Sequence, residues 1–171
     1  MTNHVHILAS PDATKSPAQM MKSLGERYAQ YANRRYGRSG TLWQGRYRSC
    51  LVDNEHYFLV CQRYIELNPV RADMVTHPAD YEWSSYRANA YGHQGRLVTA
   101  HSIYDGLGND ENERQASYRA LFQEAIPETL LEQVRHATNG NAAFGTSKFV
   151  GEMGGFLGRD LTHQRPGRRP L

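Results

Sequence analysis

Apolar and polar residues alternate from the start of the chain, where Val5 and Ile7 follow His4 and His6. In an extended strand, alternate side chains lie on the same face. The pattern therefore predicts a strand over residues 3–8, with both imidazoles on one face and the aliphatic side chains on the other. Two histidines in this arrangement can bind one metal ion together.

A helical pattern follows, with apolar residues recurring at intervals of three and four. These residues are Met20, Met21, Leu24, Tyr28 and Tyr31. Ser16 before Pro17 is typical of a helix N-cap followed by the first helical residue, and Gly37 suits a helix C-terminus. We expect a helix that begins after Ser16, ends near Tyr36 and carries its basic side chains mostly on the other face.

The next segments show a strand pattern and then a second helix. Residues 41–52 alternate partly, as in a strand. A helix capped by Asp53 or Asn54 is expected to continue through Tyr64 and to be ended by Pro69. Tyr64 and Asn68 are four residues apart, so both lie on one face if the last turn is helical.

Beyond this helix, residues 70–91 are expected to wrap around Trp83 and Tyr86 as packing anchors, with a hinge at residues 92–95. Three short helices are predicted over residues 112–122, 127–138 and 147–157. Asn139 and Gly140 are suited to end the second of them.

Basic charge is gathered in two blocks, although the net charge of the chain is only +3. Residues 15–48 contain eight basic residues against one acid, Glu26. Residues 158–171 contain four arginines, Arg159, Arg165, Arg168 and Arg169, against Asp160. Such blocks are typical of proteins that bind a phosphate backbone.

A length of 171 residues suits one domain, or one domain with an appendage. No stretch has the length and apolar character of a membrane span or a signal peptide. The chain has only two cysteines, Cys50 and Cys61, so a disulfide framework is not expected and the expected location is a reducing cytoplasm. Both cysteines are expected to be small core residues.

Two segments together resemble the HUH single-tyrosine transposases, the REP-associated, IS200-like family. One is His4-Val5-His6, and the other runs from Arg63 through Tyr64, Asn68 and Pro69 to Ala72. The resemblance implies that His4 and His6 bind a metal, that Tyr64 is the nucleophile and that Asn68 supplies a third ligand. The histidines precede the tyrosine, whereas relaxases have the opposite order.

The activity implied by this resemblance is that of a DNA transposase and endonuclease. It would cut and rejoin single-stranded DNA through a 5′-phosphotyrosine intermediate, with Mg²⁺ or Mn²⁺ as cofactor. Hairpin or palindromic DNA ends are the expected partner, a homodimer is possible, and the location is the cytoplasm at the nucleoid. The candidate DNA-binding residues are Lys22, Arg27, Arg34, Arg35, Arg38, Arg46 and Arg48.

The implied fold is α/β (α+β), a ferredoxin-like or RRM-like antiparallel sheet with helices. In this family further strands and a helix precede the histidine strand, so the catalytic domain, residues 1–92, is expected to be truncated at its N-terminus. A helical extension over residues 93–158 and a basic disordered tail over residues 159–171 complete the expected organisation.

Three alternatives remain open. The chain could be a catalytically inactive nucleic-acid-binding relic or a domesticated hairpin-binding protein. It could also be a structural zinc protein that uses His4, His6 and a cysteine. Finally, Tyr57 lies on the same helical stripe as Tyr64 and is a rival nucleophile.

Overall fold

The computed structural model describes residues 1–162 and is dominated by helices. Two compact units make up the chain. One consists of Ile7–Ser49, and the other combines Met1–His6 with the residues from Cys50 onward. The basic tail expected over residues 159–171 lies mostly outside the described residues, including Arg165, Arg168 and Arg169.

The first unit contains α1 (Ser16–Tyr36), which confirms the long helix expected here. It ends at Gly37, whose φ of 58° is the left-handed conformation that glycine adopts without strain. The expected N-cap was wrong by one residue, because Lys15 is the N-cap. Ser16 is already helical, and its hydroxyl donates to the Ala13 carbonyl at 2.7 Å instead of capping the helix.

Helix α1 is largely exposed. Its apolar stripe includes Tyr28 and Tyr31, which are 51% and 57% exposed, and Ala32 is its only buried residue. The Trp43 side chain covers part of the helix, since its ring lies 5.7 Å from that of Tyr28 and its Nε1 donates to the Gly25 carbonyl.

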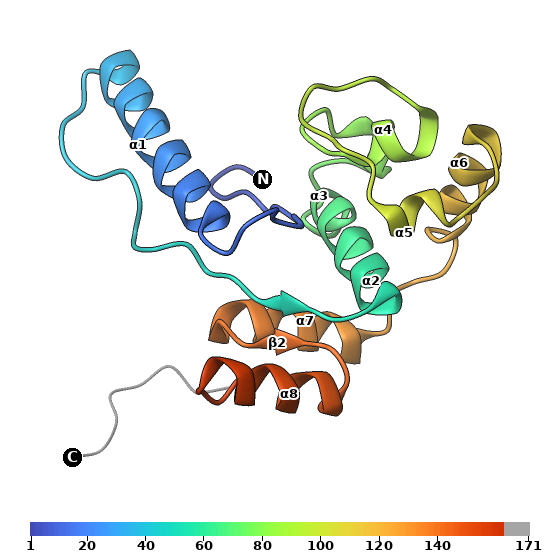
Figure 1. Ribbon diagram of the computed structural model, residues 1–171. Coiled ribbons are helices and arrows are strands. Elements are labelled where there is room, and N and C mark those ends of the chain that lie inside the picture. The colour runs from blue at the N-terminus through green and yellow to red at the C-terminus, as the bar shows by residue number, and fades with distance from the viewer. Residues whose placement is uncertain (163–171) are drawn as a thin grey trace. The chain divides into compact units, whose positions relative to one another are not determined.

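The second unit is built mainly from helices (Figure 1). They are α2 (Glu55–Glu66), α3 (Asn68–Arg71), the 3₁₀ turn η1 (Pro78–Asp80), α4 (Tyr86–Tyr91), α5 (Ser102–Asp105), α6 (Glu111–Ala120), α7 (Glu128–Gly140) and α8 (Ser147–Leu157). The second helix and the three C-terminal helices expected from the sequence are therefore found as α2, α6, α7 and α8. Pro69 was wrongly expected to end the second helix, because α2 ends at Glu66 and Pro69 lies in α3. Helices α3, α4 and α5 were not expected, because one or two turns are too short for a periodic pattern.

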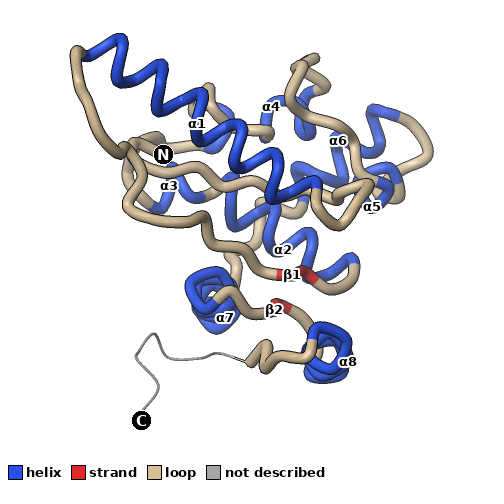
Figure 2. The backbone as a smooth tube through the Cα atoms, turned by 60° about the vertical axis from the view of Figure 1, so that its left-hand side comes forward, coloured by secondary structure: helices blue, strands red, loops and turns tan. Residues whose placement is uncertain are grey.

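The described sheet has only two strands, β1 (Leu51–Val52) and β2 (Ala143–Phe144), which pair in parallel (Figure 2). Helices α7 and α8 both pack beside β2. The strand expected over residues 41–52 is therefore confined to its last two residues.

The histidine segment is also not a strand, and residues 1–162 contain no antiparallel ferredoxin-like sheet. A strand requires hydrogen bonds to a neighbouring backbone. Within the described residues, no backbone hydrogen bond joins residues 3–8 to another segment. Accordingly, Val5 remains 64% exposed.

The aromatic core of the second unit spans the expected boundary at residue 92. It is formed by Tyr86, Ala90, Tyr104 and Tyr118, from α4, α5 and α6. Because α4 packs on α6, the segment after residue 92 does not form a compact unit of its own. Of the two expected anchors, Tyr86 is 2% exposed, whereas Trp83 is 80% exposed and was wrongly expected to pack.

A buried carboxylate connects α2 to this core. Glu66 is 1% exposed and accepts hydrogen bonds from Ser85 Oγ at 2.6 Å, Asn89 Nδ2 at 3.1 Å and Tyr118 Oη at 2.7 Å. Burial raises the pKa of Glu66 to about 7, although the three donors oppose this shift. The last turn of α2, which also carries Tyr64, is thereby anchored to α4 and α6. No helix within residues 1–162 is long and apolar enough to cross a membrane.

Candidate active site

The structure brings the two histidines and Tyr64 together within one unit. The ring centroids of His4 and His6 are 5.0 Å apart, and those of His6 and Tyr64 are 5.9 Å apart, both in edge-to-face contacts. The histidines come from the extended N-terminal segment and Tyr64 from the last turns of α2. This cluster therefore depends on the docking of the N-terminal segment near the end of α2.

The surroundings of His6 favour the neutral form of its imidazole. Burial lowers its pKa, and the positive charges of His4, the N-terminal amine and Arg71 lower it further. A neutral imidazole has a free lone pair, as a metal ligand requires. His4 Nδ1 lies 2.7 Å from Asn3 Oδ1, which orients the His4 ring.

Arg71 connects Tyr64 with Asn68. Its guanidinium carbon lies 4.5 Å from the Tyr64 ring centroid, a cation–π contact. Its Nη2 donates to the Tyr64 carbonyl at 2.6 Å and, more weakly, to Asn68 Oδ1 at 3.3 Å. This arrangement arises because α3 follows α2 after one residue, with Pro69 accommodated in the first turn of α3.

A second arginine, Arg135, lies on α7, which packs against α2. Arg135 Nη1 forms an ion pair with Glu128 Oε1 at 2.8 Å. The pKa of Arg135 is raised, first by this hydrogen bond to Glu128 and also by interaction with the Tyr64 side chain. Burial lowers the pKa of Arg71 most, the charge of Arg135 lowers it further, and the charge of Glu128 opposes this shift. The four side chains therefore form one electrostatic cluster.

Sequence reasoning missed both arginines. Arg71 follows Asn68 by three residues, so helical spacing could have placed it beside Asn68. Arg135 has no local signal, because only the packing of α7 against α2 and β1 against β2 brings it near Tyr64.

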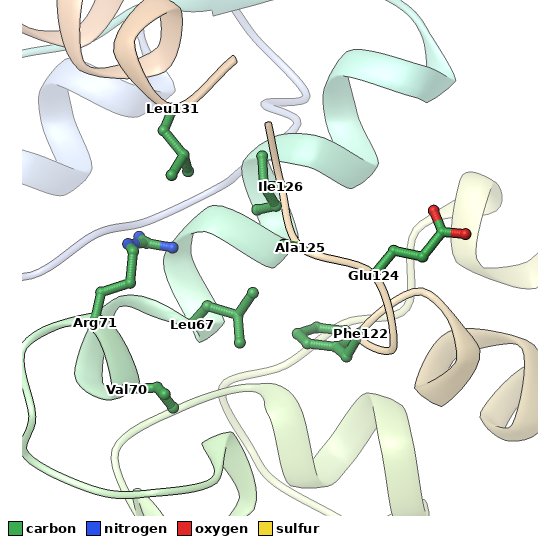
Figure 3. Close-up of a pocket in the computed structure, with 8 residues that line it drawn as sticks. All are labelled: Leu67, Val70, Arg71, Phe122, Glu124, Ala125, Ile126 and Leu131. Carbon is green, nitrogen blue, oxygen red and sulfur yellow. The ribbon is translucent and has the colours of Figure 1, made fainter. Parts of the chain in front are cut away.

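Arg71 also lines a cavity of about 370 Å³ (Figure 3). Apart from Arg71 and Glu124, its lining is apolar and comes from α3, α7, the end of α2 and the segment between α6 and α7. These residues are Leu67, Val70, Phe122, Ala125, Ile126 and Leu131. Arg71 is thus shared between the cavity and the candidate site.

The rival tyrosine has different neighbours. The Tyr57 ring lies 4.8 Å from that of Phe144 and 5.3 Å from that of His56. These contacts pack Tyr57 against β2, and within residues 1–162 no ring contact joins it to His4 or His6.

The zinc alternative finds little support. Residues 1–162 contain no group of three or more His, Cys, Asp or Glu side chains arranged to hold a metal ion. Cys61 is buried as expected, and burial raises its pKa to about 12, which disfavours the thiolate that zinc requires. Cys50 is partly buried, and its Sγ lies 3.6 Å from Thr138 Oγ1.

The seven candidate DNA-binding residues all belong to the unit Ile7–Ser49 and are exposed. Lys22, Arg27, Arg34 and Arg35 lie on α1, and Arg38, Arg46 and Arg48 follow it. The four catalytic and metal-ligand candidates belong to the other unit.

Comparison with known proteins bears on this site. Residues 1–68 match the family described as "Transposase IS200 like". This segment is therefore similar to IS200-like transposases. His4, His6, Tyr64 and Asn68 all lie within it, whereas Arg71 and Arg135 lie beyond it. No curated protein and no solved structure matches the chain.

Proposed function

We propose that the chain is a metal-dependent transposase that cuts and rejoins single-stranded DNA through a 5′-phosphotyrosine intermediate. The observation that carries this proposal is the contact between the His6 and Tyr64 rings, at a centroid distance of 5.9 Å, inside a segment of transposase sequence. The implied partners are hairpin or palindromic DNA ends and a second copy of the chain, at the nucleoid.

The donor set near Tyr64 fits a divalent ion in part. His4 and His6 offer two imidazole nitrogens from adjacent rings, and the low pKa of His6 keeps its lone pair available. The Asn68 amide oxygen is the third candidate donor, and it now accepts only a weak hydrogen bond from Arg71. Mg²⁺ or Mn²⁺ held there would withdraw charge from the scissile phosphate.

The residues of the chain supply the remaining chemistry. The Tyr64 hydroxyl oxygen attacks phosphorus, the bond to the 3′-oxygen of the neighbouring nucleotide breaks, and that oxygen leaves with a proton as a 3′-hydroxyl. The cation–π contact of Arg71 fixes the Tyr64 ring. Attack by a 3′-hydroxyl on the phosphotyrosine reverses the reaction and joins the strands.

The decisive experiment is covalent capture of DNA. The full chain is mixed with single-stranded hairpin oligonucleotides and Mg²⁺ or Mn²⁺, and adducts are sought on a denaturing gel. A metal-dependent adduct supports the proposal. Absence of any adduct across a pool of hairpins that the protein binds would contradict it.

His4→Ala and His6→Ala are expected to lower the rate of adduct formation more than about 100-fold, because loss of a metal ligand exceeds the usual effect of losing a residue that supports one. DNA affinity should be nearly unchanged, since it rests mainly on phosphate contacts elsewhere. His56→Ala, an exposed histidine on α2, is the control and should retain the wild-type rate. Wild-type rates for either variant in the presence of chelator would rule out a metal role.

A second candidate is a DNA-binding protein without catalysis. The exposed basic residues of the unit Ile7–Ser49 favour DNA binding whether or not Tyr64 acts as a nucleophile. Hairpin binding with no metal-dependent adduct would distinguish this function from the first.

Both functions predict salt-dependent DNA binding through α1. Replacing Arg27, Arg34 and Arg35 with Gln should flatten the slope of log K against log salt by about 2, since each contact to single-stranded phosphate contributes about 0.7. The measurement is a binding titration at several salt concentrations. The matched control, Arg96→Gln with Lys148→Gln, removes exposed charges from the other unit and should leave the slope unchanged. An unaltered slope in the triple variant would mean that α1 does not contact DNA.

A further inference from the structure

Two arginines from outside residues 1–68 lie on α3 and α7, the elements that contact α2, which carries Tyr64. Arg71 is half-buried and lies on the tyrosine ring. Arg135 lies on α7 one turn after Leu131, and Leu131 lines the same cavity as Arg71 (Figure 3), so this face of α7 lies beside Arg71. Neither residue belongs to residues 1–68, so the family match assigns them no role.

Arg71 has no carboxylate partner. Within residues 1–162, no ion pair within 4.0 Å involves this side chain, and its hydrogen bonds go to the Tyr64 carbonyl and the Asn68 amide oxygen. Removing a cation from water without an anionic partner is costly, so an anion bound at Arg71 would lower this cost. Within the described residues, the positive charge of Arg71 is therefore not balanced by an ion pair.

Arg135 already holds an anion in place. Its ion pair with Glu128 is exposed, with side-chain exposures of 42% and 65%, so breaking it costs little. Two guanidinium groups against one carboxylate leave one net positive charge beside Tyr64. A phosphodiester carries one negative charge and matches this excess, and the planar fork of arginine suits its oxygens.

We propose that Arg71 and Arg135 form a phosphate-binding site beside Tyr64, in which the Glu128 carboxylate occupies the place of the phosphate when DNA is absent. The site rests on the proposed function in that its ligand is the scissile or an adjacent phosphate of single-stranded DNA. On binding, Arg135 exchanges the Glu128 carboxylate for the phosphate oxygens. Helix α7 thus completes a site whose other residues lie in α2 and α3.

The binding test uses inorganic phosphate and the full chain, followed by heteronuclear NMR of the arginine Nε–Hε groups. The Arg71 and Arg135 signals, identified with Arg→Lys variants, should shift together with one midpoint. Arg135→Gln should raise the midpoint seen at Arg71 at least about fivefold, in keeping with loss of one charge-assisted contact. Absence of a common shift at the two arginines would overturn the proposal.

Glu128→Gln separates this role from a structural one. If Glu128 competes with phosphate, its neutralisation should lower the midpoint, which is opposite to the effect of Arg135→Gln. If Arg135 only supports the fold through the ion pair, both variants should weaken phosphate binding alike, and the proposal fails. Lys148→Gln removes an exposed charge from α8 and should leave the midpoint unchanged.

The rate of adduct formation provides an independent readout. Arg135→Gln should slow it about 10- to 100-fold, and Arg135→Lys should be intermediate, because a contact to the developing phosphate charge is lost or weakened. A wild-type rate in Arg135→Gln, where the wild type forms the adduct, would overturn the arginine site and leave the proposed function intact. If phosphate binds at both arginines but the wild type forms no adduct, the arginine site stands and the proposed function is overturned.

Discussion

Tyr64→Phe is expected to abolish the covalent DNA adduct and to leave hairpin affinity within about twofold of the wild type, because binding rests mainly on phosphate contacts. The change removes only the hydroxyl oxygen that attacks phosphorus. It preserves the ring that contacts His6 and Arg71, so the fold around the site should persist. The measurement is a denaturing gel with labelled DNA, together with a binding titration.

Tyr57→Phe is the matched control, since it removes the same atom from the same helix at a side chain that packs on Phe144. It should form adduct at the wild-type rate. If Tyr57→Phe loses the adduct and Tyr64→Phe retains it, the assignment of the nucleophile is reversed.

Glu66→Gln is expected to stabilise the protein at neutral and alkaline pH by up to roughly 3 kcal/mol, the energy that corresponds to a pKa of about 7 in place of 4.5. The amide keeps an oxygen that can accept from Ser85 and Asn89, and its nitrogen can donate to the Tyr118 oxygen. It has no negative charge to bury.

The direction of this pH dependence follows from the raised pKa of Glu66. Below about pH 4.5 the Glu66 carboxyl is protonated in both states, and the variant gains nothing in charge burial. As the pH rises to about 7, the unfolded state loses this proton first, so the wild type loses stability relative to Glu66→Gln. Above that pH the difference is constant. Denaturant unfolding of both proteins across this range measures it.

Glu132→Gln, an exposed glutamate on α7, is the control and should show no comparable pH dependence relative to the wild type. A difference between Glu66→Gln and the wild type that does not change with pH would mean that Glu66 titrates normally in the folded protein. That result would contradict the raised pKa of Glu66.

The sequence by itself determined the helices that have local signals. Helix α1 ends where Gly37 can adopt a left-handed conformation, and α8 begins after Thr146, whose hydroxyl accepts from the Phe149 N–H. These signals act within about one helical turn and require no distant partner. The candidate residues His4, His6, Tyr64 and Asn68 were also recognisable, because their order and spacing are carried by short segments.

Only the tertiary structure decided burial and long-range partners. Trp83 is a large aromatic residue and yet is exposed, whereas Glu66 is charged and buried, because α4 and α6 supply its hydrogen-bond donors. The alternation at residues 3–8 did not produce a strand, since no described segment pairs with it. Helix α7, which carries Arg135, packs against α2, and packing between segments so far apart in the sequence depends on the whole fold rather than on any local pattern.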